Sequence, residues 1–157
     1  DLGAVPSPQN TFILNLGLES LHLRVAQHCR NAKAVAEFLK NDERVAWVHY
    51  SDLEGDKYHA LQQKYLPNGS CGVIAFGLKG SREDAIRFMD SLKLISIVTH
   101  VADARSCVLH PASHTHRQLS DEQLRAAGVD PSLIRLSVGI EDVNDLLADI
   151  KQALALI

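Results

Sequence analysis

Apolar and polar positions follow two periods along the chain, and the change of period separates predicted helices from predicted strands. Over residues 11–40 apolar residues recur at steps of three and four, which predicts a long helix with a break at Gly17. A second amphipathic helix is predicted at the end of the chain, where the apolar stripe comprises Val143, Leu146, Leu147, Ile150 and Leu154.

Between these helices the chain alternates short apolar runs with helical segments. Strands are predicted over residues 45–50, 72–78, 94–98, 107–109 and 134–138, and a helix over 58–65. Ser81 with Asp84, and Ser120 with Gln123, have the spacing of capping boxes that open two further helices.

This order predicts an α+β fold in the form of a two-layer sandwich. We expect a small, mostly antiparallel sheet of about four strands with helices on one face. We expect the long N-terminal helix to link this two-layer domain to another part of the protein, because some thirty residues of helix are long for so small a domain. Residues 1–40 are therefore predicted as linker and linking helix, and residues 41–157 as the small domain.

Composition narrows the function classes. The 157 residues are 46% hydrophobic and 22% charged with a net charge of −3, so neither nucleic acid nor a membrane is an expected partner. The three cysteines, Cys29, Cys71 and Cys107, are widely spaced and predict reduced thiols. No signal-peptide pattern opens the chain, and we expect a cytoplasmic protein.

Three imidazoles lie within seven residues, at His110, His114 and His116, and such a cluster is one possible zinc site. Pro111 prevents a regular helix across the cluster, and no carboxylate lies within it. We therefore expect no metal site, and the stretch is read as a polar loop after a strand.

Arg135 is the better candidate for chemistry. In an alternating strand its side chain shares a face with Leu133 and Ser137, opposite the apolar residues on either side. Its planar fork suits bidentate recognition of a carboxylate, although a snorkelling edge arginine or a structural salt bridge is the more common explanation of such a pattern. Arg24 and His28, four residues apart, are read as a surface polar pair. No nucleophile elbow or phosphate-binding loop is present.

Several longer stretches carry a family resemblance. They are residues 7–10, 17–32, 65–69, 76–80, 103–116, 118–120, 127–129 and 134–142. In this order they resemble the carboxy-terminal signature of the cystathionine-synthase-like, fold-type I pyridoxal-phosphate enzymes. The resemblance covers essentially the whole chain and is closest to the O-acetylhomoserine sulfhydrylase branch.

The resemblance implies a pyridoxal-phosphate-dependent transferase that replaces a group at the γ-carbon of an O-acyl-homoserine with sulfide or a thiol, in methionine and cysteine biosynthesis. It places the Schiff-base lysine and the cofactor-binding groups in an N-terminal domain before Asp1, so this chain is expected to hold no catalytic residue, to bind no cofactor alone and to be inactive alone. A homo-oligomer is also expected.

One functional residue carries over: Arg135 matches the family arginine that binds the substrate α-carboxylate. The chain departs from the family pattern at three positions. His100 stands where Ser or Asn is usual, Ala102 where Gly is usual, and His114 where Thr or Met is usual. His100 is therefore a possible substrate contact.

Three other interpretations remain open at this point. In the first, the chain is a free-standing binding or regulatory module derived from such a domain. In the second, it belongs to another γ-replacement or γ-elimination enzyme of the same family. The third is a small metal-dependent hydrolase that uses the histidine cluster.

Overall fold

A computed structural model describes residues 3–157; the first two residues of the predicted 1–40 linking segment lie outside the described part. The helices are α1 (Pro8–Glu19), α2 (Leu21–Lys40), α3 (His59–Tyr65), α4 (Arg82–Asp90), α5 (Asp121–Ala126) and α6 (Val143–Leu154), with a 3₁₀ turn at Pro111–Ser113. The strands are β1 (Val45–His49), β2 (Val73–Leu78), β3 (Ser96–Ile97), β4 (Cys107–Leu109) and β5 (Leu133–Ser137).

The long N-terminal helix is present but divided in two at Ser20 rather than at Gly17. Ser20 has φ −104° and ψ 6°, outside the helical range, and its backbone N–H reaches the carbonyl of Leu18. Arg24 stabilises the bend by donating to the Ser20 hydroxyl and, at 2.8 Å, to the carbonyl of Gly17. Gly17 itself stays helical, because a glycine lowers helix propensity without forcing a break.

The strands form one sheet in the order β1-β2-β5-β4-β3. The predicted α+β class is confirmed; the sheet has five strands rather than four, and β3 pairs parallel to β4 while the other neighbours pair antiparallel. The strand expected over 94–98 shrinks to two residues. Its beginning is lost because the backbone N–H groups of Leu94 and Ile95 donate to the Asp149 carboxylate instead of to a neighbouring strand.

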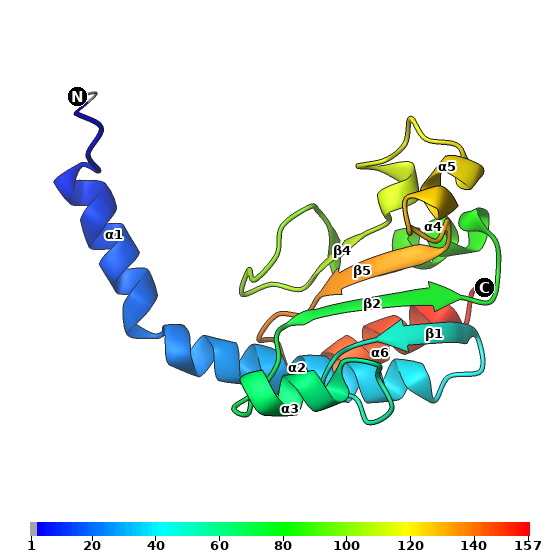
Figure 1. The fold of residues 1–157 in the computed structure, drawn as a ribbon, viewed down its shortest axis with the longest axis horizontal. Coiled ribbons are helices and arrows are strands. Elements are labelled where there is room, and N and C mark those ends of the chain that lie inside the picture. The colour runs from blue at the N-terminus through cyan, green and yellow to red at the C-terminus, as the bar shows by residue number, and fades with distance from the viewer. Residues whose placement is uncertain (1–2) are drawn as a thin grey trace.

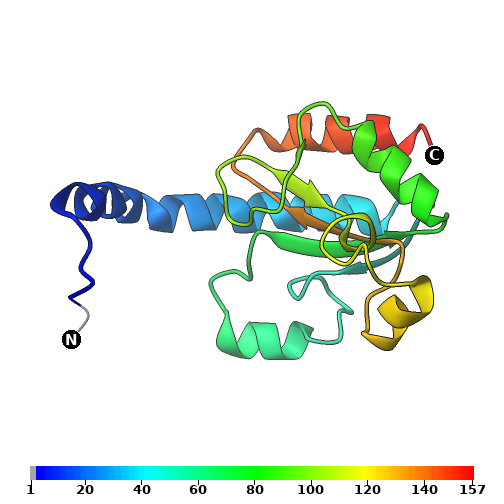
Figure 2. The ribbon, with the colours of Figure 1, turned by 90° about the horizontal axis from the view of Figure 1, so that it is seen from above.

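The core lies between one face of the sheet and helices α2, α4 and α6. In β5, Ile134 and Leu136 point into this core, as do Ile74 and Phe76 in β2. Figure 2 shows α4 and α6 on one side of the sheet and the short helices α3 and α5 on the other, so helices lie on both faces rather than on the one face expected. The last half of α2 belongs to the same core, through Ala32, Val35, Ala36 and Leu39, so residue 40 does not separate two cores.

Both predicted capping boxes are confirmed. Ser81 accepts from the N–H of Asp84 at the start of α4, and the Asp84 carboxylate accepts from the N–H of Ser81. Ser120 and Gln123 repeat the arrangement at the start of α5. These two local hydrogen bonds fix where each helix begins.

Helix α1 and the first part of α2 extend away from the rest of the molecule (Figure 1). None of the residues of α1 is buried, although this helix carries Phe12, Ile13, Leu14, Leu16 and Leu18. Among the described residues, no helix is both long enough and apolar enough to cross a membrane. The apolar surface of α1 is thus left uncovered by the other described residues, 3–157.

Candidate functional site

Arg135 lies on the central strand β5, on the sheet face that points away from the helical core. Ala75 of β2 and Leu109 of β4 flank it across the sheet. Because Ile134 and Leu136 occupy the core face, the alternation expected from the sequence is present. The position excludes the edge-strand explanation for this arginine, since β5 has a neighbour on each side.

The guanidinium of Arg135 meets a loop, residues 98–105, that runs over the same face of the sheet. Its Nη2 donates to the carbonyl oxygen of Thr99 at 2.8 Å. Within residues 3–157 no carboxylate lies within ion-pair distance of Arg135, so the structure shows no intramolecular salt bridge there. A guanidinium has five N–H donors, and the remaining four are available to an external anion.

The 98–105 loop is fixed to β5 and to the residues that follow it. The N–H of Ala102 donates to the Ser137 hydroxyl at 3.0 Å, and the N–H of Ile140 donates to the carbonyl of Ala104 at 2.9 Å. Beyond the loop, Ser106 gives its N–H and hydroxyl to the Glu141 carboxylate at 2.6 and 2.9 Å. The loop thus follows β5 and its continuation along its whole length.

The loop approaches the segment after β5 so closely that position 139 requires a glycine. A Cβ on Gly139 would lie 2.4 Å from the carbonyl oxygen of Ala104 and 2.6 Å from the amide nitrogen of Ser106. Both of these are backbone atoms, which cannot rotate away as a flexible side chain would.

Helix α2 is tied to the same strand end. His28 donates from Nδ1 to the carbonyl of Val138 at 2.6 Å, and Asn31 donates to the carbonyls of Gly139 and Glu141. His28 is only 5% exposed, so its interpretation as half of a surface pair with Arg24 is wrong. The pattern within α2 did not reveal this role, because its partners lie more than a hundred residues away.

His100, the other candidate contact, lies in the loop directly after Thr99. Its side chain is 67% exposed, with Nδ1 4.0 Å from a carboxylate oxygen of Asp103. The backbone N–H of Arg105 lowers the pKa of Asp103, which keeps that carboxylate charged. The loop thus presents an open imidazole next to the segment that touches Arg135.

The histidine cluster is organised by hydrogen bonds. His110 is fully buried, its Nε2 donates to the carbonyl of Pro131 at 2.7 Å, and its Nδ1 bonds the Ser113 hydroxyl. Burial lowers the pKa of His110, which favours the neutral ring. His114 bonds the carbonyl of His110 through Nδ1. Over residues 3–157 no group of three His, Cys, Asp or Glu side chains has metal-site geometry.

The nearest thiol to Arg135 in the sheet is that of Cys107, in the neighbouring strand β4. Burial raises the pKa of Cys107, and the nearby Asp103 raises it further. A thiol with a raised pKa is a poor nucleophile near neutral pH. All three cysteines are free, as expected from the sequence.

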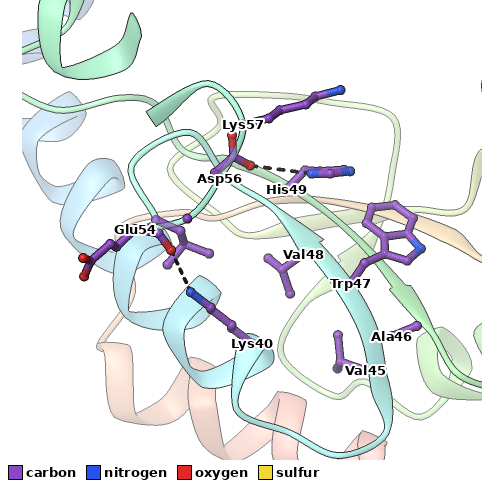
Figure 3. A pocket seen from close by; sticks show the side chains of 11 residues that line it. Lys40, Val45, Ala46, Trp47, Val48, His49, Glu54, Asp56 and Lys57 are labelled. Carbon is purple, nitrogen blue, oxygen red and sulfur yellow. Dashed lines mark hydrogen bonds and ion pairs between the residues drawn. The ribbon is translucent and has the colours of Figure 1, made fainter. Parts of the chain in front are cut away.

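A separate hollow of about 380 Å³ lies beside the edge strand β1 (Figure 3). Its polar groups are largely engaged with one another: Lys40 donates to the carbonyl of Glu54 at 2.7 Å, and Asp56 lies 3.6 Å from His49. Arg135 is not among the residues that line it. This hollow is therefore distinct from the Arg135 site.

A site for pyridoxal phosphate needs a lysine amine that is free to form a Schiff base. Of the lysines in the described chain, two have polar partners: Lys33 pairs with Asp52 at 3.1 Å, and Lys40 donates to the carbonyl of Glu54 at 2.7 Å. Arg135, in contrast, lies under the 98–105 loop without an ion-pair partner among residues 3–157.

Comparison with known proteins gives a consistent result. A sequence model of the Cys/Met metabolism PLP-dependent enzyme family matches residues 1–155. The chain is 43% identical over 155 residues to an O-acetyl-L-homoserine sulfhydrylase of Leptospira meyeri, covering 98% of this chain and 35% of that protein. It is 41% identical to an L-methionine gamma-lyase of Pseudomonas putida over 152 residues, or 97% of this chain and 38% of the relative.

A solved structure has the same fold. It is that of an O-acetylhomoserine (thiol)-lyase from Campylobacter jejuni with N′-pyridoxyl-lysine-5′-monophosphate, and it matches with a TM-score of 0.89 at 42% identity. The match covers 99% of this chain and 37% of that one. The chain thus spans little more than a third of the length of the relatives it matches, and over nearly all of its own length it belongs to the Cys/Met metabolism PLP-dependent enzyme family.

Proposed function

We propose that this chain is the substrate-binding, C-terminal part of a pyridoxal-phosphate-dependent O-acetylhomoserine sulfhydrylase, which replaces the acyloxy group of an O-acyl-homoserine with sulfide or a thiol. In this proposal residues 1–40 join it to a cofactor-binding domain, and residues 41–157 with the last half of α2 form the small domain. The enzyme that contains both parts, called here the full-length enzyme, is a cytoplasmic homo-oligomer.

The observation that carries the proposal is the environment of Arg135. The guanidinium lies on a central strand, without an intramolecular carboxylate in the described chain, and one carbonyl from the 98–105 loop orients it. An arginine in an apolar sheet needs an anion or water. The α-carboxylate of an amino acid supplies that anion, and the planar fork receives it with two parallel hydrogen bonds.

The chain's contribution is orientation rather than bond breaking. Bound pyridoxal phosphate would act as the electron sink that stabilises a carbanion at the α-carbon. Arg135 would hold the substrate carboxylate in a fixed plane, so that the bond to the α-proton is aligned when that proton leaves. We propose His100, on the loop above, as a second substrate contact, because its exposed side chain is open to the side chain or acyl group of a substrate.

The test is Arg135→Ala in the full-length enzyme, assayed for sulfide-dependent release of acetate from O-acetylhomoserine. Loss of a charge-assisted pair should lower kcat/KM by roughly 10- to 150-fold, corresponding to about 1.5–3 kcal/mol. Cofactor absorbance should be unchanged. Arg135→Lys should recover only part of the loss, because an ammonium group cannot make the bidentate contact. An unchanged kcat/KM in Arg135→Ala would overturn this role.

A γ-elimination activity is the second candidate function, and it is supported by the 41% identity to a methionine gamma-lyase. The two reactions share carboxylate recognition and differ in the fate of the γ-substituent. Release of ammonia and a 2-oxo acid without added sulfide would identify elimination. Acetate release that depends on sulfide and yields an amino acid would identify replacement.

A further inference from the structure

Two hydrogen bonds join the 98–105 loop to one face of β5, and they come from residues two positions apart. Arg135 donates to the carbonyl of Thr99, and Ser137 accepts the N–H of Ala102. Residues i and i+2 of a strand lie on the same face. Arg135 and Ser137 therefore attach the loop to the same face of β5, the face on which the guanidinium lies.

Ser137 is the buried member of this pair. It is 1% exposed, whereas Arg135 is partly exposed and its bond to Thr99 lies at the surface. The loop residue that Ser137 holds, Ala102, has a φ of 60°, the only positive φ of a non-glycine residue in the described chain. A left-handed alanine costs free energy, so something must fix it, and the Ser137 hydroxyl is its hydrogen-bond partner.

We propose that Ser137 is a positioning residue for substrate recognition: its hydroxyl sets the position of the 98–105 loop, and through the Thr99 carbonyl it sets the orientation of the Arg135 guanidinium. This inference rests on the proposed function of Arg135. Ser137 does not touch the substrate. It acts by limiting the rotamers of Arg135 before the substrate arrives and by holding His100 beside the guanidinium.

The orientation matters because one guanidinium N–H is already used. With Nη2 bonded to Thr99, the remaining N–H groups keep a fixed direction from which a carboxylate is received in a defined plane. If the loop moves, Arg135 regains side-chain freedom, and binding must then order it again. The cost appears in substrate binding, and the chemical step, which follows binding, is affected less.

The test uses Ser137→Ala in the full-length enzyme. We expect KM for the amino-acid substrate to rise about fivefold to tenfold, the size of one hydrogen bond, while kcat changes less than about twofold. Amide exchange in a peptide covering residues 98–105 should speed up by a similar factor, because Ala102 loses its acceptor. Ser137→Thr, which keeps the hydroxyl, should restore both quantities to within about twofold of the unmodified enzyme.

Coupling to Arg135 separates positioning from a general effect on stability. In an Arg135→Lys background, Ser137→Ala should raise KM by less than about twofold, because the orientation that it protects is already lost. Ser132→Ala is the matched control: this serine precedes β5 and bonds only Asp130, at 2.7 Å. Its KM should be unchanged.

The outcomes distinguish the two proposals. If Arg135→Ala lowers kcat/KM but Ser137→Ala leaves KM and loop exchange unchanged, the positioning role is wrong and the proposed function stands. If Arg135→Ala has no effect, the proposed function fails whatever Ser137 does. Should Ser137→Ala fail to fold by circular dichroism, Ser137→Cys replaces it; a thiol is a weak acceptor, so a KM within twofold of the unmodified enzyme would overturn the role.

Discussion

Ala102 adopts a left-handed backbone conformation at φ 60°, which costs an alanine about 1–2 kcal/mol relative to its preferred regions. We predict that Ala102→Gly stabilises the chain by about 0.5–1 kcal/mol. Glycine relieves most of the strain, and this gain exceeds the roughly 0.5–1 kcal/mol of extra chain entropy that glycine loses on folding. Urea unfolding followed by circular dichroism measures the difference.

The matched control for this prediction is Ala104→Gly, in the same loop and also exposed. Ala104 has a negative φ, so glycine relieves nothing there and only adds entropy to the unfolded state. This variant should lose about 0.5–1 kcal/mol. If both variants shift in the same direction, strain at Ala102 is not the cause.

The burial of His110 makes stability depend on pH. Its pKa in the folded chain lies below the ordinary value of 6.5, chiefly because of burial, so the unfolded chain binds a proton first as the pH falls. The stabilisation is complete above pH 6.5 and declines as the pH falls through the folded pKa. We predict a falling Tm between pH 7.5 and 5.5, and His110→Asn should flatten this dependence.

His22 provides the comparison for this experiment. It lies exposed on α2, so His22→Asn removes an imidazole of the same kind without removing a buried one. Tm should depend on pH as strongly in His22→Asn as in the unmodified chain, and less strongly in His110→Asn. A dependence that is reduced equally in both variants would contradict the assignment to His110.

At the scale of helices and strands, local periodicity predicted most of the fold. The final helix, the two capping boxes and the strands at 45–49, 73–78, 107–109 and 133–137 follow from apolar spacing and cap residues within a few positions. Two of the differences from the prediction have distant or competing causes. The bend falls at Ser20, where Arg24 donates to the carbonyl of Gly17 in the preceding helix, and the strand expected over 94–98 is short because Leu94 and Ile95 donate their N–H groups to Asp149.

Asp149 on α6 anchors the segment that leads into the 98–105 loop. Its buried carboxylate accepts the N–H groups of Lys93, Leu94 and Ile95 at 2.8, 3.0 and 3.0 Å. We predict that Asp149→Asn destabilises the chain by about 2–3 kcal/mol, because an amide lacks the second acceptor oxygen and the charge. Chemical denaturation gives this value directly.

Asp145, one turn earlier on α6, is the corresponding exposed aspartate. Asp145→Asn removes the same charge from the first turn of the helix, where it interacts only with the helix dipole, and should cost under about 1 kcal/mol. Equal losses for the two substitutions would mean that the hydrogen bonds of Asp149 contribute no more than a surface charge.

At the scale of the whole molecule, the candidate site could be predicted only in part. The alternation around Arg135 is local, so the sequence indicated which face of β5 it occupies. The contacts of Thr99 with Arg135, Ala102 with Ser137 and Ser106 with Glu141 join residues about 35 positions apart. No local period records such pairs, and only the assembled sheet brings them together.

Helix α1 is where the molecule lacks a partner within the described chain. Its apolar residues Phe12, Leu14 and Leu18 are 57, 63 and 61% exposed. Contiguous apolar surface of this kind drives association in water. In the proposed function the cofactor-binding domain packs against this apolar surface. When the 157-residue chain is alone, a second copy of the chain can pack there instead.

We predict that the 157-residue chain folds, associates through α1 and does not turn over substrate. Circular dichroism should show the helices, light scattering a dimer or larger species, and gel filtration no stoichiometric retention of added pyridoxal phosphate, because the proposed function places the Schiff-base lysine in the cofactor-binding domain. Leu14→Gln with Leu18→Gln should shift the chain toward monomer. Leu61→Gln with Tyr65→Gln, an exposed pair at the same spacing on α3, is the control and should leave association unchanged. Tight one-to-one cofactor retention with sulfide-dependent acetate release by this chain alone would show that the site is complete without a further domain.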